Sequence, residues 1–426
     1  MSKTIYIKSL GCPKNEVDSE VFAHIAQRQG YQLTDDLSQA DLLLLNTCGF
    51  IADAINETIY ELDTLCEIKK QHPDVRIVVT GCAVKRVAEI LKCDFPEVDN
   101  WLALKDFHGF EQLLSAEGNS VYQRLPLSPK PYVYLRISDG CNNHCAYCTI
   151  PSIRGSLTSV PLEFLVKEAK AMLKPDISEL ILIAQDVADY GTDLYGTQKL
   201  PELLEKLHEI EEYKWMRLMY LHPAHITDEL IETCARLPKI LPVFEIPLQH
   251  CNDKILERMN RRYGKSDMLN LLHNFRQAIP DAEFRTTFIT GLPGEGIKEF
   301  RALKQFIRDI PFLRMGMFAY SPEPETPAFD MQDRVSHRTA RKRQDELLAL
   351  QSELTEQHLA HYVGKTIQVI VEETNTASEE NIGRAWFDAP EIDGTVYIKG
   401  ENLHMGEIIN VVIDDIVGFD LFGHQV

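Results

Sequence analysis

Short apolar runs alternate with amphipathic segments over the first 95 residues. The order expected from this pattern is strand 4–9, helix 15–29, strand 41–45, helix 52–70, strand 75–80 and helix 84–91. Strands and helices that alternate in this way are typical of a parallel sheet with helices between its strands. We therefore expect an amino-terminal parallel α/β domain.

The same alternation resumes further along the chain. Six strands are expected at 132–137, 179–184, 215–220, 243–246, 283–289 and 314–319. Helices are expected between them, among others at 161–173, 201–211, 227–237, 266–278 and 298–309. Six β/α units predict a partial (β/α)6 barrel with its chemistry at the carboxyl ends of the strands. The segment has too few residues for a barrel of eight units.

The pattern changes again near the carboxyl end. A long charged helix is expected at 336–362, followed by short β patterns at 366–372, 382–388, 395–399 and 407–413 with glycines at the turns. Such spacing predicts a small antiparallel β-barrel. A polar stretch with several prolines precedes the six β/α units and marks a boundary. The expected division is 1–118, a linker at 119–130, the barrel at 131–335, a helical connector at 336–361 and the small β-barrel at 362–426.

Composition narrows the class of protein. The chain has 426 residues, of which 44% are hydrophobic and 25% charged, enough for two or three globular domains. No apolar run could span a bilayer, and Met1-Ser2-Lys3 leads into a strand pattern and not into a signal peptide. We therefore expect a cytoplasmic protein that makes no membrane contact. In that compartment clustered cysteines indicate metal binding or catalysis and not disulfides.

The formal net charge of −20 bears on partners. Strong general binding to nucleic acid requires Lys and Arg to displace phosphate counterions, so we do not expect it here. The negative charge of the chain would instead attract a basic protein. The carboxyl-terminal segment 361–426 carries three basic and twelve acidic residues, a net charge of −9. The alternative is that these acids only keep this module soluble.

Candidate chemistry begins with the segment CNNHCAYC. Its cysteines, Cys141, Cys145 and Cys148, follow the first strand of the six β/α units. Soft sulfur ligands favour an iron–sulfur cluster, zinc or copper(I). Three cysteines on a four-iron cluster leave one iron open, whereas structural zinc takes four ligands. The alternatives are zinc with His144 as the fourth ligand, or a chance grouping of reduced cysteines.

This spacing resembles that of the radical S-adenosylmethionine (SAM) superfamily. The resemblance implies a 4Fe-4S cluster on the three cysteines, with Tyr147 beside the nucleoside of SAM. Polar residues after the other strands would complete the cofactor site; the expected contacts are Gln185, Arg217, Glu245, Gln249, Gly291, Pro293 and Gly294. The last three belong to the segment Gly-Leu-Pro-Gly-Glu, which lacks the spacing of a phosphate loop. Its alternative interpretation is a tight strand-to-helix turn.

A second trio of cysteines lies in the amino-terminal domain. Cys12, Cys48 and Cys82 each follow a predicted strand within a few residues. Carboxyl ends of parallel strands share one edge of the sheet, where such folds bind ligands, so the three thiols are expected to meet at one site. Cys66 and Cys93 do not share this placement and are expected to be buried structural thiols.

The second trio resembles that of the methylthiotransferases, in which three cysteines hold a second 4Fe-4S cluster. The segment Cys12-Pro13-Lys14-Asn15 is similar to the branch that modifies a ribosomal protein, whereas the tRNA-modifying branch generally has CQMN. Further matching segments are 150–155, 184–186, 221–223, 247–250, 259–261 and 320–323, and the carboxyl-terminal module resembles a TRAM domain. The chain departs from the family at Thr158-Ser159-Val160, where relatives usually have Arg-Ser-Arg, and at Glu325, where they often have Gly.

The resemblance implies an enzyme that transfers sulfur-containing groups. It would convert a C–H bond on the β-carbon of an aspartate in the twelfth protein of the small ribosomal subunit into C–S–CH3. SAM would be both the radical source and the methyl donor, with an external electron donor and a sulfur source as further partners. One alternative is a tRNA adenosine methylthiotransferase, and another is a non-catalytic metal-binding assembly protein.

Overall fold

The computed structural model describes residues 3–114, 123–375 and 380–426. The chain forms two compact units. The first comprises Met1–Pro129 and Thr149–Gly155, and the second Lys130–Cys148 and Ser156–Val426. Part of the predicted linker at 119–130 lies outside the described residues.

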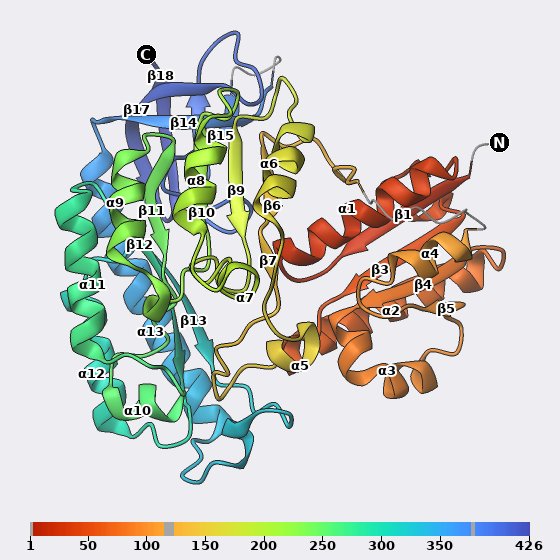
Figure 1. The fold of residues 1–426 in the computed structure, drawn as a ribbon, viewed down its shortest axis with the longest axis horizontal. Helices are drawn as coiled ribbons and strands as arrows, with labels where there is room; N and C mark the ends of the chain where they lie inside the picture. Colours follow the sequence, from red (N-terminus) through yellow and green to blue (C-terminus); the bar gives the residue numbers. More distant parts are fainter. Residues whose placement is uncertain (1–2, 115–122, 376–379) are drawn as a thin grey trace. The chain divides into compact units, whose positions relative to one another are not determined.

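The first unit is built on a parallel sheet with the strand order β2-β1-β3-β4-β5 (Figure 1). Its strands are β1 (Thr4–Ser9), β2 (Gln32–Leu33), β3 (Leu42–Thr47), β4 (Arg76–Gly81) and β5 (Asn100–Trp101). Its helices are α1 (Pro13–Arg28), α2 (Ala52–Gln71), α3 (Cys82–Asp94), α4 (Phe107–Leu113) and α5 (Ile150–Arg154), with a 3-10 turn at Leu37–Gln39. Every residue of β3 is buried because apolar clusters form on both faces of the sheet.

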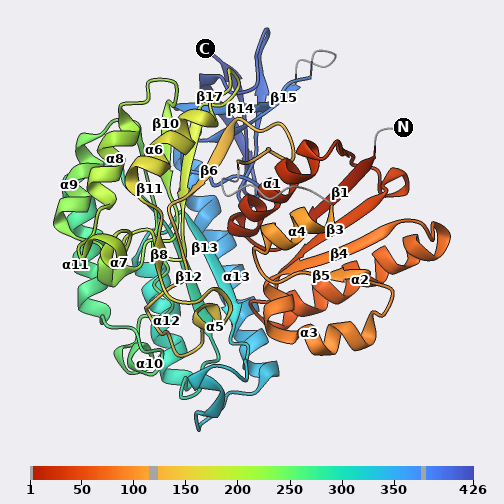
Figure 2. The same ribbon diagram turned by 45° about the vertical axis from the view of Figure 1, so that its right-hand side comes forward.

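The second unit contains the six-stranded parallel sheet, in the order β13-β12-β11-β10-β9-β6. Its strands are β6 (Tyr132–Arg136), β9 (Glu179–Ile183), β10 (Trp215–Leu218), β11 (Ile240–Glu245), β12 (Glu283–Thr290) and β13 (Arg314–Ala319). The helices α6 (Leu162–Ala171), α8 (Leu200–His208), α9 (Asp228–Arg236), α11 (Lys265–Ala278) and α12 (Ile297–Asp309) cover one face, as Figures 1 and 2 show. These elements confirm the predicted partial barrel.

Shorter elements complete this unit. They are β7 (Ser138–Asp139), β8 (Thr158–Ser159), α7 (Thr192–Tyr195), α10 (Asp253–Arg258) and 3-10 turns at Pro223–His225 and Pro327–Asp330. Thr158 and Ser159, at which the family resemblance predicts Arg and Ser, pair with β7, and the Ser159 hydroxyl donates to Asp193. The departure from the family pattern therefore forms part of a small two-stranded sheet.

The carboxyl-terminal module follows the long helix α13 (His337–Leu359) and a 3-10 turn at Ala360–Tyr362. It is a closed barrel of β14 (Thr366–Glu373), β15 (Glu380–Ala385), β16 (Val396–Lys399), β17 (Ile408–Val417) and β18 (Asp420–Gln425). The sequence pattern predicted only four of these strands. It missed β18, in which Gly423 and polar residues weaken the alternation, and β18 closes the barrel through a parallel pairing with β16.

Buried charges join this barrel to the amino ends of the parallel strands. Glu179 at the start of β9 accepts hydrogen bonds from both Arg217 of β10 and Arg384 of β15. Burial alone would raise the pKa of Glu179, but the two guanidinium groups lower it below its ordinary value. Arg314 donates to Asp388 of the barrel in the same way. In the described part of the chain no helix is both long and apolar enough to cross a membrane.

Candidate metal centres

The three amino-terminal cysteines lie at the ends of three adjacent strands. Cys12 follows β1 and caps α1, Cys48 follows β3, and Cys82 follows β4 as the first residue of α3. Because β1, β3 and β4 are neighbours and run parallel, the cysteines emerge at one edge of the sheet.

Glycines let the cysteine loops approach closely. Gly11 has a φ of +85°, and a Cβ there would lie 2.7 Å from the Cys48 sulfur. A Cβ on Gly49 would lie 2.6 Å from the backbone of Ala83, next to Cys82. Neither position has room for a side chain, so the two glycines bring the loops together.

The thiols influence one another electrostatically. Burial raises the pKa of the Cys82 thiol to about 12, against an opposing effect of the Arg154 charge and with smaller contributions from Cys12 and Cys48. Burial likewise raises the pKa of Cys48, with Cys12 adding to the effect. A cationic metal centre would offset the cost of ionising Cys48 and Cys82 at this site.

The two remaining cysteines of this domain differ from each other. Cys66 is buried, as expected, but Cys93 is exposed, so its prediction as a buried thiol is wrong. Cys93 lies in the last turn of α3, two residues after the buried Leu91. Two residues correspond to about half a helical turn, so Cys93 faces solvent.

The loop that carries Cys141, Cys145 and Cys148 is held by contacts to the segment 259–261. The amide of Ala146 donates to the carbonyl of Met259 at 2.9 Å, and the Asn260 side chain donates to the carbonyl of His144 at 2.8 Å. His144 and Asn260 both have left-handed φ angles, +49° and +55°. The cysteine loop is thus tied to a distant part of the chain on both sides of Cys145.

Polar donors point at the sulfur atoms of this loop. The Arg261 guanidinium lies 3.3 Å from the Cys145 sulfur. The side-chain amide of Asn143 lies 3.4 Å from the sulfur of Cys141, whose pKa burial raises to about 11. Such donors stabilise thiolate ligands and tune the centre that they bind.

The spacing of the sulfur atoms favours a cluster over a single zinc ion. Thiolates on one tetrahedral zinc lie about 3.8 Å apart. Among the described residues, neither cysteine trio brings its three sulfur atoms within 4.8 Å of one another. His144, the alternative zinc ligand, is exposed. The wider spacing fits a multi-iron cluster.

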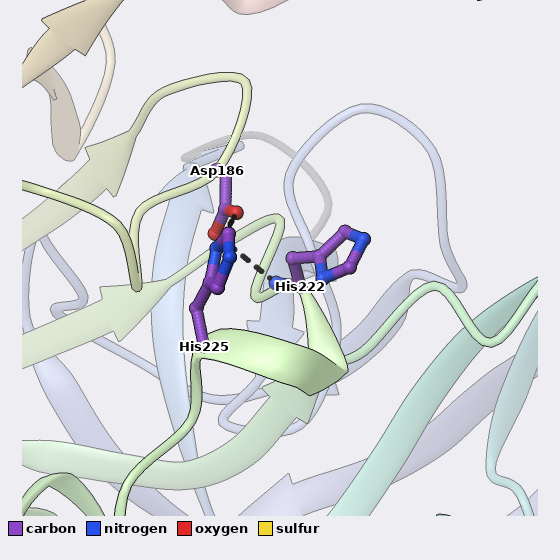
Figure 3. A group of neighbouring side chains, drawn as sticks. All are labelled: Asp186, His222 and His225. Carbon is purple, nitrogen blue, oxygen red and sulfur yellow. Dashed lines mark hydrogen bonds and ion pairs between the residues drawn. The ribbon is translucent and has the colours of Figure 1, made fainter. Parts of the chain in front are cut away.

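Asp186, His222 and His225 do bring three ligand atoms within 4.8 Å (Figure 3). The Asp186 carboxylate already accepts hydrogen bonds from His225 Nδ1 at 2.7 Å, from the Asn143 amide at 2.9 Å and from the backbone amides of Ala188 and His222. Figure 3 shows the ring of His222 turned away from the carboxylate. Four donors leave a metal ion little access, so we interpret Asp186 as the group that orients Asn143 toward Cys141.

The structure leaves two predicted cofactor contacts with unused polar atoms. Gln185, after β9, donates to Asp139 at 3.0 Å, and its buried side-chain oxygen has no hydrogen-bond partner among the described residues. The side-chain oxygen of Gln249, which follows β11, is also buried without a hydrogen-bond partner among the described residues. Unmatched buried oxygens at the carboxyl ends of strands fit a polar ligand such as a nucleoside.

Tyr147 and Glu245 are two further predicted cofactor contacts. Tyr147 lies within the cysteine loop, where burial raises the pKa of its hydroxyl and Arg261 acts in the opposite direction. Glu245 ends β11 and forms an ion pair with Arg285 at 3.9 Å.

Arg217 is placed differently from the prediction. Its guanidinium donates to Glu179 and to the carbonyl of Trp386 in the barrel. These bonds direct it toward the amino end of the sheet, so we remove Arg217 from the candidate cofactor contacts.

The Gly-Leu-Pro-Gly-Glu segment has a structural explanation. A Cβ on Gly291 would lie 2.3 Å from Ala340 of α13, and one on Gly294 would meet the guanidinium of Arg258. Pro293 is buried between these glycines. Protein atoms therefore fill the space beside both glycines, which favours the alternative of a tight strand-to-helix turn over cofactor contact by Gly291, Pro293 and Gly294.

A groove of about 1380 Å³ lies elsewhere in this unit. It is lined by residues at the amino ends of the strands and by the small barrel, among them Trp215, Glu283 and Trp386. The loop with Cys141, Cys145 and Cys148 follows the carboxyl end of β6, so this groove is separate from the candidate centre of the same unit.

Comparison with known proteins identifies the family. Residues 4–103 match the uncharacterized protein family UPF0004, 135–307 the radical SAM superfamily and 363–426 the TRAM domain. Proteins named ribosomal protein uS12 methylthiotransferase RimO are 40% identical in Thermotoga maritima and 42% in Carboxydothermus hydrogenoformans, each over 98% of both chains. The chain belongs to this methylthiotransferase family. It is therefore an enzyme of the class that transfers sulfur-containing groups, as predicted.

Solved structures support the fold of this methylthiotransferase. The radical SAM methyltransferase TsrM from Kitasatospora setae, with cobalamin and a [4Fe-4S] cluster bound, has a TM-score of 0.56 at 12% identity over 77% of both chains. The cobalamin-dependent radical enzyme OxsB has a TM-score of 0.52 and covers 82% of this chain and 56% of its own. The sequence prediction identified the family segments 150–155 and 259–261 but missed the contacts that Arg154 and Arg261 make to the cysteine sites.

Proposed function

We propose that this methylthiotransferase converts a C–H bond on the β-carbon of an aspartate in ribosomal protein uS12 into C–S–CH3. The observation that carries the proposal is the 37–42% identity to uS12 methylthiotransferases along nearly the whole chain. Two cysteine trios, one at three strand ends of the first unit and one in a single loop of the second, support the chemistry.

We assign one 4Fe-4S cluster to each trio. Cys141, Cys145 and Cys148 would hold a cluster that would supply the electron for cleavage of SAM to the hydrogen-abstracting radical, and Cys12, Cys48 and Cys82 would hold one that would supply sulfur for methylation by a second SAM. The protein orients these groups and excludes water.

Side chains of the second unit have defined roles in this proposal. The Arg261 cation balances thiolate charge at Cys145, and Asp186 orients Asn143 toward Cys141. Gln185 and Gln249 offer their unused oxygens to the nucleoside of SAM, with Tyr147 beside it.

Charge on the small barrel supports a basic protein substrate. Part of the acidic surplus is internal, since Asp388, Glu391 and Asp393 pair with Arg314, Lys130 and Arg285 of the same unit. Among the described residues of the barrel, six further acids are exposed: Glu373, Glu380, Glu401, Glu407, Asp414 and Asp415. Such a surface attracts Lys- and Arg-rich protein and repels phosphate. An electron donor and a sulfur source complete the expected partners.

The proposal is tested with anaerobically reconstituted enzyme, SAM and a reductant. With uS12 as substrate, mass spectrometry should show the gain of one SCH2 unit on an aspartate. Cys145→Ala should abolish SAM cleavage, whereas Cys48→Ala should keep SAM cleavage and lose methylthiolation. Cys93→Ala, at an exposed cysteine of the same domain, is the matched control and should keep both.

Two outcomes would reject the proposal. Modification of tRNA alone would favour the tRNA-modifying branch. Zinc in the anaerobically purified protein, together with no reductant-dependent SAM cleavage, would favour a metal-binding assembly protein.

A further inference from the structure

A cation lies buried beside the amino-terminal cysteines. Arg154 ends α5, in the segment Thr149–Gly155, which directly follows Cys148 in sequence but belongs to the first compact unit. The hydroxyl of Thr149 donates to the carbonyl of Phe50 at 2.8 Å and fixes the start of this segment. The side chain of Arg154 is only 1% exposed.

The surroundings of Arg154 link it to one of the cysteines. Its guanidinium donates to the Asn15 side-chain oxygen at 2.6 Å and to Asp18 at 3.2 Å. The Cys82 sulfur lies 3.7 Å from the same Asn15 oxygen.

Asn15 is itself held in place from two strand ends. Its amide nitrogen donates to the carbonyl of Leu10 at 2.8 Å, after β1, and to that of Thr47 at 3.0 Å, in β3. The amide therefore has one orientation, with its oxygen toward Arg154 and Cys82. Once Cys82 is a thiolate it has no proton to donate to this oxygen, and Arg154 remains as the donor.

We propose that Arg154 is a positioning and charge-compensating residue for the centre on Cys12, Cys48 and Cys82. A fixed cation beside a cluster favours the state with one more electron, because that state carries more negative charge. Arg154 thus raises the reduction potential of this centre, and Asp18 limits the increase by partly neutralising the guanidinium. The inference rests on the proposed presence of a cluster at this site.

The test uses the full-length chain with Cys141, Cys145 and Cys148 all replaced by Ala, so that one centre remains. After anaerobic reconstitution, the midpoint potential is measured by redox titration followed by electron paramagnetic resonance. Arg154→Gln should move the potential to more negative values. Asp18→Asn should move it to more positive values, and Arg154→Lys should stay close to the parent.

Arg28→Gln is the matched control, since Arg28 is exposed at the end of α1, and its potential should equal that of the parent. Unchanged potentials in both Arg154→Gln and Asp18→Asn, or shifts of the same sign, would overturn the inference. If the Arg154→Gln variant loses its iron, the Asp18→Asn variant decides. An unchanged potential in Asp18→Asn would then overturn the inference, and a positive shift would support it. No substrate is present, so these results are independent of whether uS12 is modified.

Discussion

His250, in the loop after β11, is completely buried and stays uncharged. Its Nδ1 accepts a hydrogen bond from the backbone amide of Asn252 at 3.0 Å, which requires that nitrogen to carry no proton. Burial, with a smaller contribution from Arg343, lowers the pKa of His250 to about 3. The sequence shows that this residue follows a predicted strand but could not show its burial.

The buried imidazole makes stability depend on pH. Below the ordinary pKa of 6.5 the unfolded chain binds a proton that the folded chain refuses, so stability falls as the pH falls. This effect should cost about 1.4 kcal/mol between about pH 7.5 and pH 5.5. In urea unfolding of the metal-free protein, His250→Gln should remove that part of the pH dependence. His273→Gln, at an exposed position of α11, should leave it unchanged.

At the scale of elements, the turn between β12 and α12 shows how a glycine-rich segment can be structural. Glu295 accepts hydrogen bonds from the Thr290 hydroxyl, from the Gly291 amide and from Arg343 of α13. The sequence identified the turn and its glycines. It could not show that α13, about 50 residues away, packs against them.

Gly291→Ala should therefore destabilise the protein in two ways. Gly291 has a φ of +85°, and its new Cβ would meet Ala340 at 2.3 Å. Left-handed strain and overpacking together should cost about 2–4 kcal/mol. Gly196→Ala is the matched control, because Gly196 has a φ of +74° and nothing within 4 Å of the added Cβ, so strain alone should cost about 1 kcal/mol. Equal urea midpoints for the two variants would contradict the packing explanation.

At the scale of the second unit, the small barrel is part of the body that it follows in sequence. Arg384 donates to Glu179 of the six-stranded sheet, to Glu372 of the barrel and to the carbonyl of Asp388. All of the Arg384 side chain is buried, and Arg217 completes the group around Glu179. Removing one member of such a network leaves uncompensated charge in the interior.

Arg384→Met should consequently cost about 3–5 kcal/mol in the free energy of unfolding. Arg236→Met, which breaks an exposed pair with Glu205, should cost less than about 1 kcal/mol. Probes in the barrel and in the six-stranded sheet, for example Trp386 and Trp215, should report one shared transition in the unmodified protein. Separate transitions would show that the barrel is an independent module.

Much of the fold and of the site followed from local patterns. Periodicity located the strands that precede each cysteine, and the shared edge of parallel strands then predicted that Cys12, Cys48 and Cys82 would gather. The same reasoning placed Gln185 and Gln249 at strand ends. The strand positions could be inferred because burial imposes a regular spacing on residues that are neighbours in sequence.

Only the tertiary structure decided which charged side chains meet. Arg154 pairs with Asp18 across 136 residues of sequence, and Arg384 pairs with Glu179 across 205. It also assigned Arg217 to the barrel interface, away from the predicted cofactor site. A single charged residue has no periodicity, and its partner is set by how distant segments pack, so local sequence contains no signal for these pairs.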